Sequence, residues 1–181
     1  IRMQEGGRHE LFGTHNKLLA LDNGLYLECI AVDTKAKKPK HPRWFNLDNF
    51  FGKPRLSNWV CSCEDIEYEL AEMSVHLGRV IEVSRGDYSW IITVPENGVL
   101  PFDGCLPALI KWPSIQKHPL VTLIPSGLSL RSLTIYHPNA SELQELLSSL
   151  SDERVSFRVR SYSGLSAHFS NSLGKEIILE T

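Results

Sequence analysis

Side chains suited to acid–base chemistry gather near the start of this 181-residue chain. Thr14, His15 and Asn16 follow a glycine and open an apolar stretch, and Glu28 lies inside a second apolar stretch. A carboxylate inside an apolar strand loses hydration on folding, so it needs a hydrogen-bonding, charged or metal partner, or a place on the solvent face of its sheet. An imidazole and a carboxylate on one face can bind a metal ion or transfer protons. His15 and Glu28 are therefore candidate catalytic residues and candidate metal ligands.

A β-hairpin is the element that must position these side chains. The turn sequence Asp22-Asn23-Gly24 separates the two apolar runs. Counting outward from the turn places Glu28 opposite Leu18, with His15 about three residues further along. Side chains alternate between the two faces of a strand, so the register decides whether His15 and Glu28 share a face. The alternative is that Glu28 points to solvent and that His15 caps a strand end.

Arginine and tryptophan side chains add candidates for a binding pocket. Arginine recognises a carboxylate through two parallel hydrogen bonds, and an aromatic wall suits a planar or apolar ligand. The candidate substrate-binding residues are Asn16, Arg43, Trp44, Arg85, Trp90, Lys111 and Trp112. The alternative for Trp90 and Trp112 is that they fill the core, and for Arg85 that it lies in a surface turn.

Hydrophobic periodicity predicts an α+β fold. Residues Ile1–Arg8 are polar and rich in glycine, which predicts a loop. The predicted helices are Glu64–His76, with Asp65 as N-cap, and Asn139–Leu150, and a short helix is expected at Leu47–Phe51. The predicted strands are Lys17–Leu21, Leu25–Val32, Leu56–Cys63, Val80–Ser84, Tyr88–Val94, Leu106–Trp112, Leu128–Tyr136, Val155–Val159, Gly164–Phe169 and Glu176–Leu179. The order strand, helix, strand, strand, strand occurs twice, which predicts an internal repeat.

Several segments resemble the glyoxalase-like branch of the vicinal oxygen chelate superfamily. They are GGRHELFGTHN, LYLECIAVD, PRWFNLD, SRGDYSWIITVPENG, LPALIKW, and a closing segment with YHPN and NSLGKEIIL. The resemblance implies repeated β-α-β-β-β modules whose curled mixed sheets enclose a small-molecule cavity. It divides the chain into residues 1–55, the remainder of a first module with its hairpin and lid loop, residues 56–113, a second module, and residues 114–181, a connector with a C-terminal unit. The missing strand and helix of the incomplete first module are expected upstream of Ile1.

The resemblance also implies a pattern of metal ligands. In metal-dependent members, each module offers a His near the start of its first strand and a Glu on its last strand. Glu28 matches the Glu position of module one, whereas module two has Asn58 at the His position and Lys111 at the Glu position. This departure favours a site without the usual metal ion held by four ligands. His15 is a candidate substitute for the third ligand. The one cofactor that the resemblance suggests is a divalent metal ion. Lys111 is expected to pair with Glu28 across the cavity or to receive an anionic substrate.

Composition excludes several classes of protein. A formal charge of −2, from 19 basic and 21 acidic residues, does not suit a general nucleic-acid binder. The basic run Lys35–Lys40 has no interleaved aromatic residues and predicts a solvated loop. No apolar run approaches the roughly 18 residues that cross a membrane, and no signal peptide is visible. The four cysteines lack zinc-ribbon spacing and predict reduced core thiols in a cytoplasmic protein: Cys29, Cys61, Cys63 and Cys105.

Two functions are compatible with these residues. The first is a glyoxalase-like enzyme of lyase, isomerase or dioxygenase type that acts on a small polar or anionic molecule. His15 is then the acid–base group, Glu28 a base or metal ligand, and Arg85 or Lys111 the anion anchor. The alternative is a metal-free protein that binds or sequesters a small molecule on the same scaffold, and a weaker third idea is an interaction module. A homodimer is also compatible, because superfamily sheets complete their cavity by pairing modules within or between chains.

Overall fold

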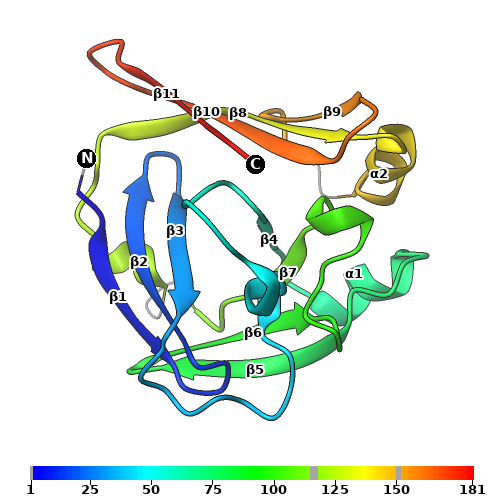
Figure 1. Ribbon diagram of the computed structural model, residues 1–181. Helices are drawn as coiled ribbons and strands as arrows, with labels where there is room; N and C mark the ends of the chain where they lie inside the picture. Colours follow the sequence, from blue (N-terminus) through cyan, green and yellow to red (C-terminus); the bar gives the residue numbers. More distant parts are fainter. Residues whose placement is uncertain (1, 115–117, 150–151) are drawn as a thin grey trace.

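The computed structural model describes residues 2–114, 118–149 and 152–181. Within these ranges the protein is mostly β-structure with few helices, and its strands form three separate sheets (Figure 1). Strands and helices are both present, as the α+β prediction requires, but the strands dominate. No helix in the described ranges has both the length and the apolar character needed to cross a membrane.

The first sheet holds the predicted hairpin. Its strands are β1 (Gln4–His9), β2 (Thr14–Leu21) and β3 (Leu25–Val32), in that order. The turn between β2 and β3 has positive φ angles at its two central residues, 65° and 75°, as an Asn-Gly turn requires. The pairing of Leu18 with Glu28 confirms the register counted from the turn.

The predicted loop at Ile1–Arg8 is wrong over most of its length. Ile1 lies outside the described residues, but Gln4–His9 forms β1 and pairs antiparallel with β2. Its polar, glycine-rich sequence gives little sign of a strand. The pairing with β2 supplies the backbone hydrogen bonds, and Gly6 and Gly7 leave room for side chains that cross the inner face.

The second sheet comes from residues 60–111. It contains β4 (Val60–Ser62), β5 (Arg79–Arg85), β6 (Tyr88–Val94) and β7 (Ala108–Lys111), in the order β4-β7-β6-β5. β4 runs parallel to β7, and the other neighbours are antiparallel. The helix α1 (Ile66–Glu72) connects β4 to β5.

The third sheet is C-terminal. It contains β8 (Leu128–His137), β9 (Val155–Val159), β10 (Gly164–Asn171) and β11 (Glu176–Glu180), with the helix α2 (Ala140–Leu146) between β8 and β9. Its order is β11-β10-β8-β9, so the first strand of this unit lies between the second and third. In the second sheet the first strand pairs with the last instead. The order of elements therefore recurs along the chain, but the pairing of strands does not.

Both helices are shorter than predicted. Asp65 caps α1 as expected and accepts a hydrogen bond from the backbone N–H of Tyr68, but the backbone turns extended at Met73. α2 ends at Leu146, while the predicted end, Leu150, lies outside the described residues. Three 3₁₀ turns complete the described elements: η1 (Trp44–Asn49), η2 (Phe102–Gly104) and η4 (Pro119–Val121). The predicted strand Leu56–Cys63 is reduced to β4, because β7 offers it only three partners.

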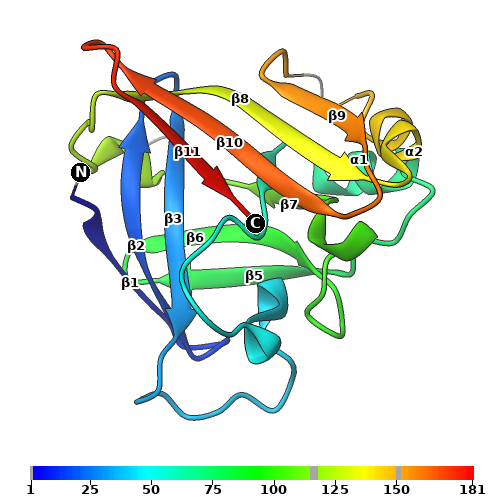
Figure 2. The same cartoon turned by 45° about the horizontal axis from the view of Figure 1, so that its top comes forward.

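Two apolar clusters hold the sheets together. One lies between the C-terminal sheet and the other two, and it includes Leu19, Leu109 and Ile135. The C-terminal sheet crosses the turn end of the hairpin (Figure 2), where the N–H of Asp22 donates to the carbonyl of Leu128 at 2.7 Å. The second cluster lies between the first two sheets and surrounds the aromatic residues described below. All four cysteines are free, but Cys29 is exposed, which corrects the expectation that it is a core thiol.

Candidate functional site

A small pocket lies between the inner faces of the first and second sheets. One wall comes from β1, β2 and β3, the other from β4, β5, β6 and β7, and η1 and η4 add the remainder. Water-sized molecules can reach about 40 Å³ of this space. The polar and aromatic side chains that line it are His9, Asn16, Tyr26, Glu28, Trp44, Phe45, Arg85, Trp90 and Trp112.

Asn16 is the centre of the polar network in this pocket. Its amide nitrogen donates to Oε1 of Glu28 at 2.6 Å. Its amide oxygen accepts from Nη1 of Arg85 at 3.0 Å and from the backbone N–H of Gly7 at 2.9 Å. The side chain is buried, with 4% exposure, and three of its hydrogen-bonding positions are used. One residue thus connects a carboxylate from β3 to a guanidinium from β5.

Glycine at two positions of β1 allows this approach. A Cβ atom at Gly6 would collide with the amide oxygen of Asn16, and one at Gly7 would lie 2.8 Å from Cδ of Arg85. Both glycines therefore provide space rather than an unusual backbone angle. Gly6 and Gly7 suggested a loop, but in the structure the space at Gly7 lets the side chain of Arg85 pass β1 and reach Asn16.

Burial controls the charge of Glu28. Loss of hydration raises the pKa of its carboxyl group, while the hydrogen bond from Asn16 and the positive charge of Arg85 partly oppose this rise. A carboxyl group whose pKa is raised in this way is a stronger proton acceptor than an exposed carboxylate. The pKa of the nearby Tyr26 phenol is also raised, mainly by burial and further by the charge of Glu28.

Arg85 is a buried cation without a carboxylate within ion-pair distance among residues 2–114, 118–149 and 152–181. Its guanidinium carbon lies 5.5 Å from the ring centre of Tyr88 and 5.9 Å from that of Trp90, which gives cation–π contacts. One of its five N–H groups is used by Asn16. Arg85 lines both the pocket and an outer groove beside β1, so its guanidinium can receive an anion.

His9 is a further titratable group in the pocket, and the sequence did not single it out. Nδ1 lies 3.0 Å from the hydroxyl oxygen of Thr14, and the ring contacts Trp44 and Trp90 edge-on, with centroids 5.0 and 5.8 Å away. Burial, with smaller contributions from the charges of Arg85 and His15, lowers the pKa of His9 to about 3. His9 is therefore a neutral imidazole at physiological pH.

This shift predicts a pH dependence of stability. Between pH 3 and 6.5 the unfolded chain binds a proton at His9 and the folded protein does not, so acid favours unfolding. Neutral His9 makes its full contribution to the free energy of unfolding above pH 6.5. About 2 kcal/mol of this free energy is lost between pH 7.5 and pH 5. Urea unfolding at these two pH values should show a smaller drop in the free energy of unfolding for His9→Asn than for the wild type. Equal drops would contradict the assignment.

Five of the seven predicted substrate-binding residues lie together in the pocket: Asn16, Trp44, Arg85, Trp90 and Trp112. Glu28 joins them, but the structure does not bring His15 to it. His15 pairs with Ala31 and is exposed on the opposite face of the sheet. The register therefore places Asn16, not His15, beside Glu28.

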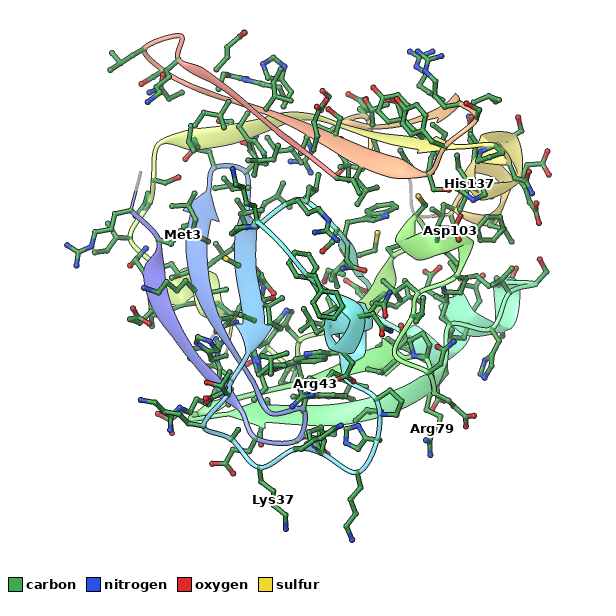
Figure 3. All side chains as sticks on the ribbon, viewed as in Figure 1. Met3, Lys37, Arg43, Arg79, Asp103 and His137 are labelled. Atoms are coloured by element: carbon green, nitrogen blue, oxygen red, sulfur yellow. The ribbon has the colours of Figure 1, made fainter. Side chains whose placement is uncertain are left out.

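Arg43 and Lys111 also lie outside the pocket lining. Arg43 is buried and neutralised by Asp48, which accepts from its backbone N–H at 2.8 Å and from its guanidinium; Figure 3 shows Arg43 inside the molecule. Lys111 alternates with the pocket residue Ile110 and therefore faces the other side of β7, where its charge acts on Cys63. No ion pair joins Lys111 to Glu28 among the described residues, which corrects the expected pairing across the cavity.

One of the two polar residues that were missed had a usable signal. Tyr26 precedes Glu28 by two positions in β3, so strand alternation places both side chains on one face. For His9 there was no such signal, because β1 itself was not predicted. Its place in the pocket follows from the pairing of His9 with Thr14.

The donor set of the pocket does not fit a divalent metal ion. A protein site for such an ion usually needs three or more ligands, and the described residues contain no group of three His, Cys, Asp or Glu side chains close enough to hold one. Here His9 and Glu28 are the available donors, and Oε1 of Glu28 already accepts from Asn16.

The sequence and fold were then compared with known proteins. Residues 1–151 match a family model described as a glyoxalase-like domain. The comparison with curated proteins gave no match. Among solved structures, the crystal structure of a hypothetical protein from Staphylococcus aureus is similar, with a TM-score of 0.54 and 15% sequence identity, over 98% of this chain and 76% of that chain. This likeness shows the fold alone, but the family match spans most of the sequence, and the chain therefore belongs to the glyoxalase-like domain family.

Proposed function

We propose that this protein is an enzyme of lyase or isomerase type that transfers a proton on a small anionic molecule, with Glu28 as the proton-transferring group. The observation that carries the proposal is the network in which Asn16 binds both Glu28 and Arg85 inside an aromatic pocket. It sets a proton acceptor and an anion receptor at a fixed separation on two facing sheets. A carboxyl group whose pKa is shifted by burial, as that of Glu28 is, is typical of active sites when it lies in a pocket beside a charged partner.

The roles follow from the chemistry of each side chain. Arg85 binds the carboxylate of the ligand, and the aromatic wall excludes water and holds the rest of the molecule. The ionised Glu28 takes a proton from a carbon beside a carbonyl group, and the electron pair of that C–H bond moves to the carbonyl oxygen as an enolate. Glu28 then returns the proton to the same carbon, and the electron pair of the enolate forms the new C–H bond as the carbonyl group is restored. The neutral His9 can donate a hydrogen bond to this oxygen without adding charge.

We also propose that the first and second sheets form two halves of one ligand cavity. In support, the pocket takes residues from every strand of both sheets. On this view, residues 1–55 and residues 56–113 act as paired modules, and residues 114–181 support the hairpin from outside. The different strand order of the C-terminal sheet is consistent with a supporting role rather than a third copy of the module.

A metal-free binding or sequestering protein is the second candidate. The observation that favours it is that Glu28 and Arg85 are each already hydrogen-bonded to Asn16 within the protein. A site built only to hold a ligand needs no group left ready for proton transfer. This candidate predicts saturable binding without any chemical change in the ligand.

Proton transfer can be tested without knowing the natural substrate. The protein is incubated in D₂O with a panel of small 2-oxo and 3-oxo acids, and loss of the acidic C–H signal is followed by ¹H NMR. We expect exchange above the buffer rate for at least one acid. Arg85→Met should weaken the binding of that acid by about tenfold or more, because a charge-assisted hydrogen bond is lost.

Arg8→Met is the matched control for this experiment. Arg8 lines the outer groove but not the pocket, is largely exposed and pairs with Asp33 at 3.2 Å. Its replacement should leave exchange and binding unchanged. Saturable binding that depends on Arg85 but is never accompanied by exchange would select the binding protein instead. An equal effect of both substitutions would contradict a specific role for Arg85.

A further inference from the structure

The indole of Trp44 is a buried hydrogen-bond donor without a partner. Trp44 is 3% exposed and lines the pocket, yet its Nε1–H has no acceptor among the described residues. Buried polar groups in folded proteins are nearly always paired, so such an exception points to a missing partner. Trp59 shows the ordinary case, because its Nε1–H donates to the carbonyl of Cys105 at 2.8 Å.

The surrounding residues hold this indole in one orientation. Phe12 stacks on it with centroids 4.2 Å apart and an interplanar angle of 10°, Phe45 packs nearby at 5.2 Å, and His9 meets its edge. The indole therefore has little freedom to turn towards another acceptor. Its donor is fixed before any ligand arrives, which reduces the cost of ordering on binding.

The backbone next to Trp44 is strained. Phe45 and Asn46 have φ angles of 55° and 54°, in the left-handed region that residues with a side chain rarely adopt. The N–H of Asn46 donates to the carbonyl of Gly98 at 2.7 Å, which holds this conformation. Strain of this kind persists where the surrounding structure maintains it, and it is common at ligand-binding sites.

We propose that the Nε1–H of Trp44 is a specificity-determining donor for a second oxygen of the ligand. This rests on the proposed function in one respect, namely that Arg85 holds the ligand carboxylate. An indole N–H only donates, so its partner must be an acceptor and not an ammonium group or a C–H group. The ligand class is therefore a small carboxylate with a further acceptor oxygen, as in 2-oxo and 2-hydroxy acids.

The test compares matched ligand pairs by calorimetric titration. Pyruvate is compared with propionate, and 2-oxobutyrate with butyrate, because each pair differs by the second oxygen. The wild type should bind the 2-oxo member of at least one pair about tenfold more tightly. Trp44→Phe keeps a ring but removes the N–H, so it should bind the two members of each pair with equal affinity.

Trp59→Phe is the matched control, because Trp59 lies outside the pocket lining. It should retain the ligand preference but unfold at a lower temperature than Trp44→Phe, since it leaves the carbonyl of Cys105 without its donor. No preference in the wild type, or a preference that survives Trp44→Phe, would overturn the proposal.

A second measurement needs no substitution that affects folding. In ¹H–¹⁵N spectra of wild-type protein, one indole N–H signal should shift strongly with pyruvate and little with propionate; equal shifts with both would overturn the proposal. Both readouts report equilibrium binding and are independent of proton transfer. The absence of exchange activity alone would therefore refute the proposed enzyme but not the role of Trp44. An unchanged Trp44 signal would refute the role of Trp44 but not the proposed enzyme.

Discussion

Glu28→Gln is expected to lower the rate of C–H exchange by about 10²- to 10⁴-fold, the usual contribution of a general acid–base group. The substitution keeps the shape of the side chain and an oxygen that can accept from Asn16. It removes the capacity to take up a proton. Binding of the exchanged acid should remain within a few-fold of the wild type, because Arg85 and the aromatic wall are unchanged. The measurements are exchange by NMR and affinity by calorimetry.

Stability gives an independent check on the same variant. The pKa of Glu28 is raised in the folded protein, so the folded state holds the proton more tightly than the unfolded chain. Its contribution to stability is therefore present in acid and is lost as the pH rises above the ordinary value of 4.5. Glu28→Gln should be at least as stable as the wild type at pH 8. Loss of activity together with unfolding would contradict the catalytic assignment.

Glu82→Gln serves as the matched control for Glu28→Gln. Glu82 lies on β5, is exposed, and lines the outer groove but not the pocket. Its replacement removes the same charge close to Arg85 in sequence without touching the Asn16 network. It should leave exchange unchanged. A similar fall in both variants would indicate that net charge, rather than proton transfer at Glu28, controls the reaction.

Gly98→Ala is expected to destabilise the protein by about 4 kcal/mol or more. Gly98 has a φ angle of 74°, and an added Cβ would collide with the backbone carbonyl of Arg43. The collision involves backbone atoms, so the strained segment that follows Arg43 must move. We expect Trp44 to shift with it, so the variant should also lose the preference for 2-oxo acids. Urea unfolding measures the first effect and calorimetric titration the second.

Gly52→Ala separates the collision from the cost of the backbone angle. Gly52 also has a positive φ angle, 91°, but an added Cβ there meets no atom within 4 Å. This variant should lose only about 1–2 kcal/mol, the cost of the left-handed conformation. Equal losses at the two positions would show that the contact between Gly98 and Arg43 has no special effect.

The part of the site that the sequence predicted is the part that depends on local geometry. The Asn-Gly turn determined the register of the hairpin, and that register placed Glu28 opposite Leu18. Strand alternation then resolves the remaining choices. His15 and Asn16 are neighbours in β2, so only one of them can face the pocket, and it is Asn16. Lys111 and Trp112 are also neighbours, and Trp112 lines the pocket.

The remaining features depend on contacts between distant segments. β1 forms because β2 supplies its hydrogen bonds, and His9 reaches the pocket only through that pairing. Lys111 was assigned to the pocket by aligning two modules, but alternation along β7 turns it away. The pairing of the C-terminal strands had no local signal, since the same order of elements produces a different sheet. The expected homodimer and cytoplasmic location stay predictions.

The spacing of two sheets, rather than the size of any one side chain, sets the dimensions of this pocket. β1 and β5 lie next to each other as the outermost strands of their sheets, and no backbone pairing joins them along their described lengths. The side chain of Arg85, passing Gly7, is what bridges this seam. The C-terminal sheet holds the turn end of the hairpin through the hydrogen bond from Asp22 to Leu128. Residues at this distant contact therefore help to set the position of the hairpin, and with it the distance between the two walls of the pocket.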